Sequence, residues 1–162
     1  MSGTADRVAA LFAAARTDAG LLQAALRVEE VAALAYAAAA ESLAGAERAQ
    51  ALRFADHERE HAAAFDTMLQ ALTVPAREHA GQAQLDALLP GLRGAGRRDT
   101  LRRLAELEGA AIAGHQQIGR RLRALDALRT VAAVMAGGAQ HLVVLRHALG
   151  QTELTHAYET GR

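Results

Sequence analysis

The chain has 162 residues, of which 51% are hydrophobic and 3% aromatic, and its 18 basic and 18 acidic residues give a formal net charge of zero. The length suits one domain with a real core, and the balanced charge argues against nucleic acid or an anionic membrane as a partner. Because there is no cysteine, disulfides, thiolate metal sites and thiol catalysis are excluded. The alanine- and leucine-rich composition favours closely packed helices over a sheet.

Two features bear on the compartment. Residues 1–7 lack an apolar segment behind a basic start and do not resemble a signal peptide. The most apolar run, residues 31–40, is too short to span a membrane and is bounded by Glu30 and Glu41. We therefore expect a cytoplasmic protein without a membrane partner.

Hydrophobic periodicity predicts a short leading helix over about residues 4–16, followed by four long helices. The first long helix covers about residues 18–43 and ends at Gly45, and the second covers about 46–72 and ends before Pro75, because the residue before proline avoids helix. The third covers about 98–123, with Asp99 and Thr100 as its start signal, and the fourth covers about 125–149 and ends at Gly150. The apolar positions of each helix form a heptad-like seam.

Residues 73–97 form the longest weakly patterned stretch, with one short helix expected at about residues 82–89. This stretch is long enough to cross the whole bundle. Two short-looped helix pairs joined by a long crossover build an antiparallel four-helix bundle, so the predicted fold class is all-α. We expect a single domain over residues 1–150 and a polar tail over residues 151–162.

Acids and histidines interrupt all four apolar seams near mid-helix. A carboxylate at a core position is unfavourable unless something pairs with it, and antiparallel packing would bring the four interruptions to about one height. Carboxylates and neutral imidazoles together suit a hard or borderline divalent ion. The pattern therefore predicts a buried metal site. Its residues are Glu29, Glu58, His61, Glu108 and His141.

The two halves of the chain repeat each other. The segments LRVEEVAALAY and FADHEREHAAAF of the first half correspond to LAELEGAAIAGHQQI and AGGAQHLVVLRHALG of the second. On these segments, which span about residues 18–150, the chain resembles the ferritin-like superfamily, and in particular small bacterial ferritin-like domains with a carboxylate-bridged two-metal site.

The resemblance implies that Glu29, Glu58, His61, Glu108 and His141 bind one or two iron or manganese ions, with zinc as an alternative. It further implies an oxidoreductase of the ferroxidase type that acts with oxygen or peroxide. No catalytic residue and no organic substrate can be named.

Gly138 departs from the family pattern, because it stands where the last Glu-x-x-His motif should have its carboxylate. Three carboxylates balance only three of the four charges of two divalent ions, so we expect one tight and one weak ion, or a site without redox activity. Gly137 and Gly138 lower helix stability by about 1 kcal/mol each relative to alanine. They indicate a close backbone approach, a gap that a water, hydroxide or exogenous acid fills, or drift in a degenerate site.

Three further residues are expected near the site. Tyr36 and His115 lie two helical turns from Glu29 and Glu108, and we expect them to be buried and hydrogen-bonded, not ligands. His57 lies one turn from His61 and either contacts a ligand or is partly exposed.

Two alternatives remain open. Residues 57–61 spell HEREH, the zinc-peptidase signature, although neither strands nor a third ligand at a family spacing supports that interpretation. A non-catalytic binding or scaffold bundle with a vestigial metal site is the other alternative. The sequence also leaves open whether the chain forms a homodimer.

Overall fold

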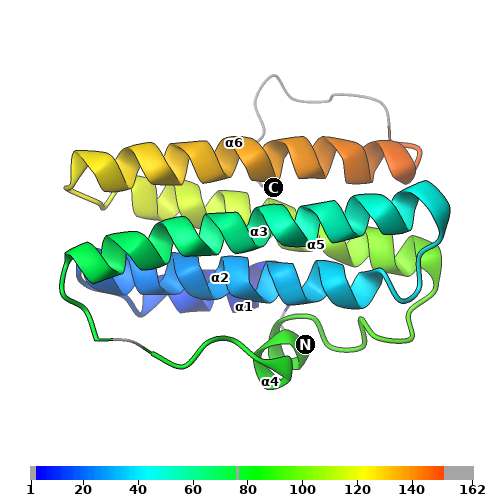
Figure 1. Cartoon of the computed structure of the whole chain (residues 1–162), viewed down its shortest axis with the longest axis horizontal. Helices are drawn as coiled ribbons and strands as arrows, with labels where there is room; N and C mark the ends of the chain where they lie inside the picture. Colours follow the sequence, from blue (N-terminus) through cyan, green and yellow to red (C-terminus); the bar gives the residue numbers. More distant parts are fainter. Residues whose placement is uncertain (1–2, 76, 152–162) are drawn as a thin grey trace.

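The structure is a computed structural model that describes residues 3–75 and 77–151. In this part the chain forms helices and no strand, which confirms the predicted all-α class (Figure 1). The tail expected over residues 151–162 lies outside the described residues except for Gln151. The helices are α1 (Thr4–Ala13), α2 (Asp18–Ala39), α3 (Gly45–Ala71), α4 (Gln82–Leu88), α5 (Arg97–Gly119) and α6 (Leu125–Ala148).

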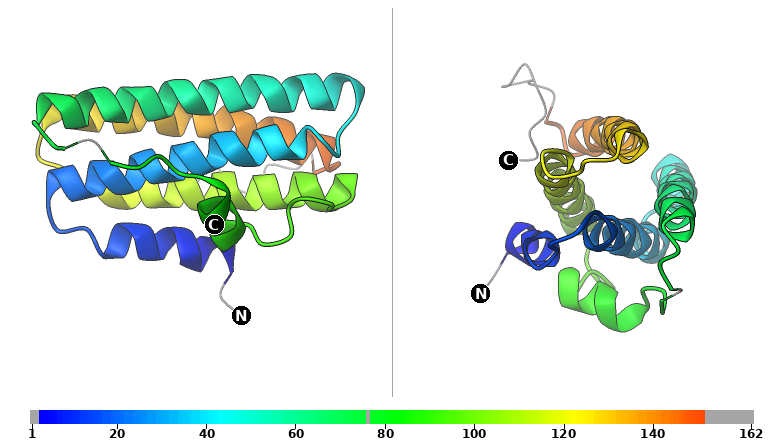
Figure 2. Two further views of the ribbon diagram at one scale, coloured as in Figure 1. Left: turned by 60° about the horizontal axis from the view of Figure 1, so that its bottom comes forward. Right: turned by 90° about the vertical axis from the view of Figure 1, so that its left-hand side faces the viewer.

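The four long helices form an antiparallel bundle, and α1 and α4 lie outside it (Figure 2). Helices α2 and α3 make one hairpin, α5 and α6 make the other, and the segment after α3 runs along the outside of the bundle to the start of α5 (Figure 1). This is the predicted crossover. Glu30 of α2 ties it down, because its carboxylate accepts hydrogen bonds from Arg77 Nη2 at 2.8 Å and from the backbone N–H of Ala80 at 3.1 Å.

The start signal of α5 and the ends of α2 and α5 differ from the prediction. Helix α5 begins at Arg97 with Gly96 as its N-cap, so Asp99 and Thr100 are not the start signal. Thr100 is fully buried, and its hydroxyl lies 3.1 Å from that of Ser42, which explains why this polar residue stands inside the helix. Helices α2 and α5 both end about one turn before the predicted residue.

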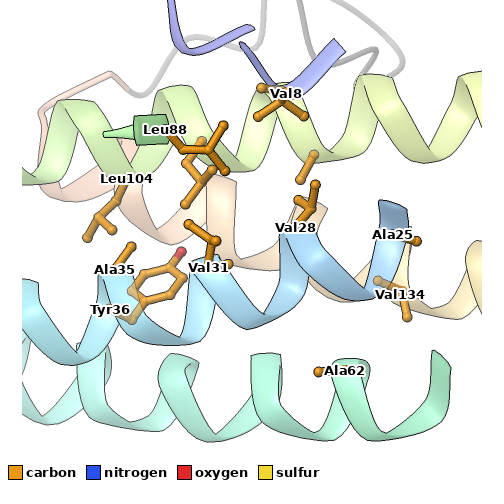
Figure 3. Packing of buried hydrophobic residues seen from close by; sticks show 14 of the residues in the cluster. Val8, Ala25, Val28, Val31, Ala35, Tyr36, Ala62, Leu88, Leu104 and Val134 are labelled. Atoms are coloured by element: carbon orange, nitrogen blue, oxygen red, sulfur yellow. The ribbon is translucent and has the colours of Figure 1, made fainter. Parts of the chain in front are cut away.

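The core is built mainly from small and aliphatic side chains, as Figure 3 shows around Val31, Ala35 and Leu104. The seam residues of α2 and α5 are all buried, which places the faces of these helices as predicted. Helix α6 is long and apolar enough, by length and composition alone, to cross a membrane. In this fold it is a bundle helix that packs on α5 and carries a buried histidine, His141.

Candidate metal centre

The structure brings the five predicted ligand residues into one cluster. They form two groups of three side chains whose ligand atoms lie within 4.8 Å of one another, and Glu58 belongs to both groups. The three carboxylates and His141 are at most 3% exposed, and the side chain of His61 is 18% exposed. The groups are Glu29, Glu58 and His61 on one side and Glu58, Glu108 and His141 on the other.

Glu58 lies between the two groups because its oxygens point to different histidines. Its Oε2 is 2.9 Å from Nδ1 of His61, and its Oε1 is 2.8 Å from Nδ1 of His141. Each Nδ1 also meets the second carboxylate of its group at 3.1 Å, which is Glu29 for His61 and Glu108 for His141. Both imidazoles therefore present the same nitrogen to the carboxylates. A carboxylate in this position can bridge two ions.

Tyr36 and His115 each face the glutamate of the opposite hairpin. The hydroxyl of Tyr36, on α2, donates to Oε1 of Glu108, on α5, at 2.5 Å. Nε2 of His115, on α5, lies 3.3 Å from Oε1 of Glu29, on α2, and has no hydrogen-bond partner among the described residues. The two halves of the internal repeat thus exchange contacts: Tyr36 of the first half faces Glu108 of the second, and His115 of the second half faces Glu29 of the first. The prediction of buried residues near the site is correct for both, and the hydrogen bond holds for Tyr36 alone.

Gly137 and Gly138 allow α6 to approach the cluster closely. A Cβ atom at Gly137 would lie 2.8 Å from both Cε1 and Nε2 of His61, so this glycine makes room for the imidazole. A Cβ atom at Gly138 would lie 3.1 Å from Oε2 of Glu108 and 3.6 Å from Cγ1 of Ile112. Glu108 and Ile112 therefore occupy the space beside Gly138. Each glycine thus lies against a candidate ligand, Gly137 against His61 and Gly138 against Glu108, and the closer approach is at Gly137.

His57 contacts the cluster from outside. Its Nδ1 lies 3.1 Å from Nε2 of His141, and its side chain is exposed to solvent. His57 therefore both contacts a candidate ligand and is exposed, the two possibilities that the sequence left open. The zinc-peptidase interpretation would make it a ligand beside His61, but within the described residues it belongs to neither three-residue group.

Burial and mutual contacts shift the pKa values of the three carboxyl groups in different directions. Burial, reinforced by the charge of Glu58, raises the pKa of Glu29 well above its ordinary value and that of Glu108 to about 7. Burial also disfavours the charged form of Glu58, but hydrogen bonds from both histidines outweigh it and lower its pKa.

The pKa values of the buried histidines shift in opposite directions. Burial alone would lower the pKa values of His61 and His141, but their hydrogen bonds to the carboxylates raise these values to about 10 and about 9. His115 has no such bond, and burial lowers its pKa to about 4. Burial, with the nearby charge of Glu108, raises the pKa of Tyr36 well above its ordinary value. When no cation is bound, these raised pKa values favour protonated His61 and His141, which balance part of the negative charge of the carboxylates.

The donor set fits a divalent cation. Three carboxylates and two imidazoles converge from four helices in a buried place, and the carboxylates repel each other unless protons or cations lie between them. An apolar cavity of about 310 Å³ reaches Tyr36 and Phe54 from one end of the bundle. Phe54 stacks on His141 with ring centroids 3.9 Å apart, so the cavity ends beside the cluster.

Fold and site together define a helical-bundle protein with a carboxylate- and imidazole-rich core. The chain matches the model of the ferritin-like domain over residues 17–151, and it belongs to that family. No curated protein matches the chain.

One similar solved structure is a Thermotoga maritima protein called a ferritin-like diiron-carboxylate protein. The two chains are 21% identical, the alignment covers 83% of this chain and 95% of the other, and the TM-score is 0.64. At this identity the likeness shows a common fold.

Proposed function

We propose that this protein binds one or two iron or manganese ions at the cluster and acts as an oxidoreductase of the ferroxidase type with oxygen or peroxide. The position of Glu58 carries the proposal, because its two oxygens face two separate sets of ligands. The ferritin-like fold shared with a protein called diiron-carboxylate supports it. A bound iron or manganese ion would supply the redox chemistry.

The residues of the chain would hold the ions and keep the site dry. Glu58 would bridge, Glu29 and His61 would complete one ligand set, and Glu108 and His141 would complete the other. Tyr36 holds Glu108 in place through its hydroxyl. The apolar cavity that ends at Tyr36 would give a small uncharged molecule such as oxygen a route toward the cluster.

The two ligand sets are not equivalent. No carboxylate stands at Gly138, and Glu108 and Ile112 already occupy the space beside it. The set that contains Glu108 and His141 therefore lacks the fourth acid of the family pattern. We expect the ion at Glu29, Glu58 and His61 to bind more tightly than the ion at Glu108 and His141.

A second function, that of a binding or scaffold bundle with a vestigial metal site, is favoured by one observation. The carboxylates are already paired without a cation, because His61, His141 and Tyr36 all contact them. A bundle stabilised in this way would need no metal.

Anaerobic titration with ferrous ion, followed by metal analysis after gel filtration, separates the two functions. The proposal predicts about two equivalents bound per chain, with one weaker than the other, and an optical change when air is admitted. Loss of all iron, manganese and zinc on gel filtration would leave only the scaffold function.

Five variants test the assignment of the ligands. Glu58→Ala should weaken both ions because it removes the shared ligand. Glu29→Ala should weaken mainly the tight ion and Glu108→Ala mainly the weak one. Glu60→Ala serves as the control, because Glu60 is an exposed acid on the same helix. His57→Ala should keep both ions, whereas the zinc-peptidase interpretation requires it to abolish binding.

A further inference from the structure

A groove outside the bundle carries three arginines. It lies between the C-terminal end of α1, the first half of α2 and the crossover, with a volume of about 500 Å³. Arg16, Arg27 and Arg77 line it together with Gln23, and its other lining residues are glycine, alanine and leucine. Within the described residues no acid lines the groove, and it shares no residue with the metal cluster.

Arg27 differs from the other described arginines. Apart from Arg27, every described arginine whose guanidinium group makes no hydrogen bond or ion pair to a described residue is exposed. Arg27 is partly buried, and its Nη1 is inaccessible and has no partner. The exposed ones are Arg48, Arg98, Arg120 and Arg123.

Arg77 contributes a second donor of the same kind. Its Nη2 pairs with Glu30 and its Nη1 donates to the carbonyl of Glu78, but its Nε is buried and has no partner among the described residues. Two arginines from different segments thus line one groove, and each has a buried guanidinium N–H without an acceptor among the described residues.

A buried donor without an acceptor is unfavourable, and the penalty is larger when the group is charged. The planar fork of a guanidinium matches the oxygens of a phosphate, which can accept two parallel hydrogen bonds from it. Since the net charge of the chain is zero, this local excess of positive charge is not a general property of the surface.

We propose that this groove binds a phosphate group, with Arg27 and Arg77 as its principal hydrogen-bond donors and Arg16 as a further positive charge. The ligand is either free phosphate or the phosphate of a lipid headgroup. The proposal does not depend on the metal site, because the two sites share no residue.

The first test uses inorganic phosphate with a chelator present, so that phosphate cannot act through a bound metal. At constant ionic strength set with chloride, phosphate should raise the melting temperature of the wild type. Arg27→Gln should lower the phosphate affinity about tenfold, which corresponds to the loss of one charge-assisted hydrogen bond. Arg48→Gln is the matched control, since Arg48 is exposed and equally unpaired, and it should bind phosphate like the wild type.

Stability without phosphate separates ligand binding from a structural role. Because Arg27 has no partner in the described chain, Arg27→Gln should be as stable as the wild type in phosphate-free buffer. A clear loss of stability there would show that Arg27 supports the fold and would overturn the proposal.

The second test identifies the source of the phosphate, with phosphatidylcholine vesicles that contain or lack phosphatidic acid. Co-flotation of the wild type only with phosphatidic acid, and loss of it in Arg27→Gln, would assign a lipid headgroup. A response to inorganic phosphate alone would assign a soluble ligand. If neither ligand distinguishes Arg27→Gln from the wild type, the groove binds no phosphate.

Discussion

Gly137 illustrates how a residue without a side chain can set the geometry of a site. A methyl group at this position would meet the ring of His61 at 2.8 Å, closer than real Cβ contacts allow. At the neighbouring Gly138 the nearest atom is Oε2 of Glu108 at 3.1 Å, so a methyl group there would require a much smaller shift of its neighbour. The two glycines therefore differ in what they permit, although both stand in mid-helix.

We predict that Gly137→Ala displaces His61 and weakens the tight metal ion by about tenfold or more, as loss of support around a ligand commonly does. Gly138→Ala should change metal affinity much less. Both variants replace glycine by a better helix former, so lower metal affinity in Gly137→Ala should come without lower stability of the metal-free protein. Competition titration with manganese and thermal denaturation measure the two quantities. Equal affinities in the two variants would contradict this role for Gly137.

The inward-facing residues could be predicted from the sequence because a helix fixes the angle between its own side chains. Glu29, Glu58 and Glu108 are all buried, as the seams predicted. The contacts of Tyr36 and His115 could not be predicted in the same way. They depend on the relative rotation and height of α2 and α5, which no single helix pattern contains. The sequence offered a close backbone approach at Gly137 and Gly138 as one of three explanations, but which side chain each glycine faces depends on the same relative placement of helices.

At the scale of elements, α3 and α6 end in the same way with different residues. At the end of α3 the backbone N–H of Val74 donates to the carbonyl of Leu69, and at the end of α6 that of Gln151 donates to Arg146. Both are Schellman motifs, which need a residue with positive φ. Helix α6 uses Gly150, with φ of 77°, whereas α3 uses Thr73, with φ of 54°.

We predict that Thr73→Gly stabilises the protein, because a β-branched residue is strained in the left-handed region by about 1–2 kcal/mol. Thr73 is exposed, so little packing is lost. The expected rise in melting temperature is about 2–4 °C per kcal/mol for a chain of this size. Gly150→Thr should lower it by a similar amount. If Thr73→Gly melts at or below the wild-type temperature, the strain at this position is negligible.

The order and type of the helices were predictable because each long helix carries a strong seam. Their ends were less so. Thr100 resembles a cap in the sequence but is a buried partner of Ser42, a contact between α5 and the loop after α2. The true N-cap is Gly96, which has no side chain to cap the helix, so the search for a polar capping residue could not find it.

At the scale of the whole molecule, the bundle buries three carboxyl groups close together, and they cannot all be ionised without protons or cations beside them. Glu29 and Glu108 keep protons to higher pH than exposed carboxylates, and His61 and His141 keep theirs to about pH 10 and about pH 9. A metal ion needs these same groups deprotonated. Protons and metal ions therefore compete for one set of ligands, and this competition couples metal binding to the stability of the fold.

The coupling gives a pH dependence whose sign can be worked out. Between about pH 6.5, where an unfolded histidine loses its proton, and about pH 9–10, the folded metal-free protein holds more protons than the unfolded chain at His61 and His141. Glu108 acts in the same direction between about pH 4.5 and about pH 7. His115, whose pKa is lowered to about 4, acts in the opposite direction only below about pH 6.5. Stability must then fall as pH rises from about 6.5 to about 9, since it falls wherever the native state binds more protons.

We therefore predict that the chelator-treated protein melts at a lower temperature at pH 9 than at pH 6.5. With saturating manganese the difference should shrink or reverse, because the ion replaces the protons that high pH removes. The increase in melting temperature on adding metal should thus grow with pH, and Glu58→Ala, which loses the shared ligand, should show little increase at either pH. Parallel pH profiles for the metal-free and metal-loaded protein would mean that the ion binds elsewhere and that protons alone neutralise the cluster.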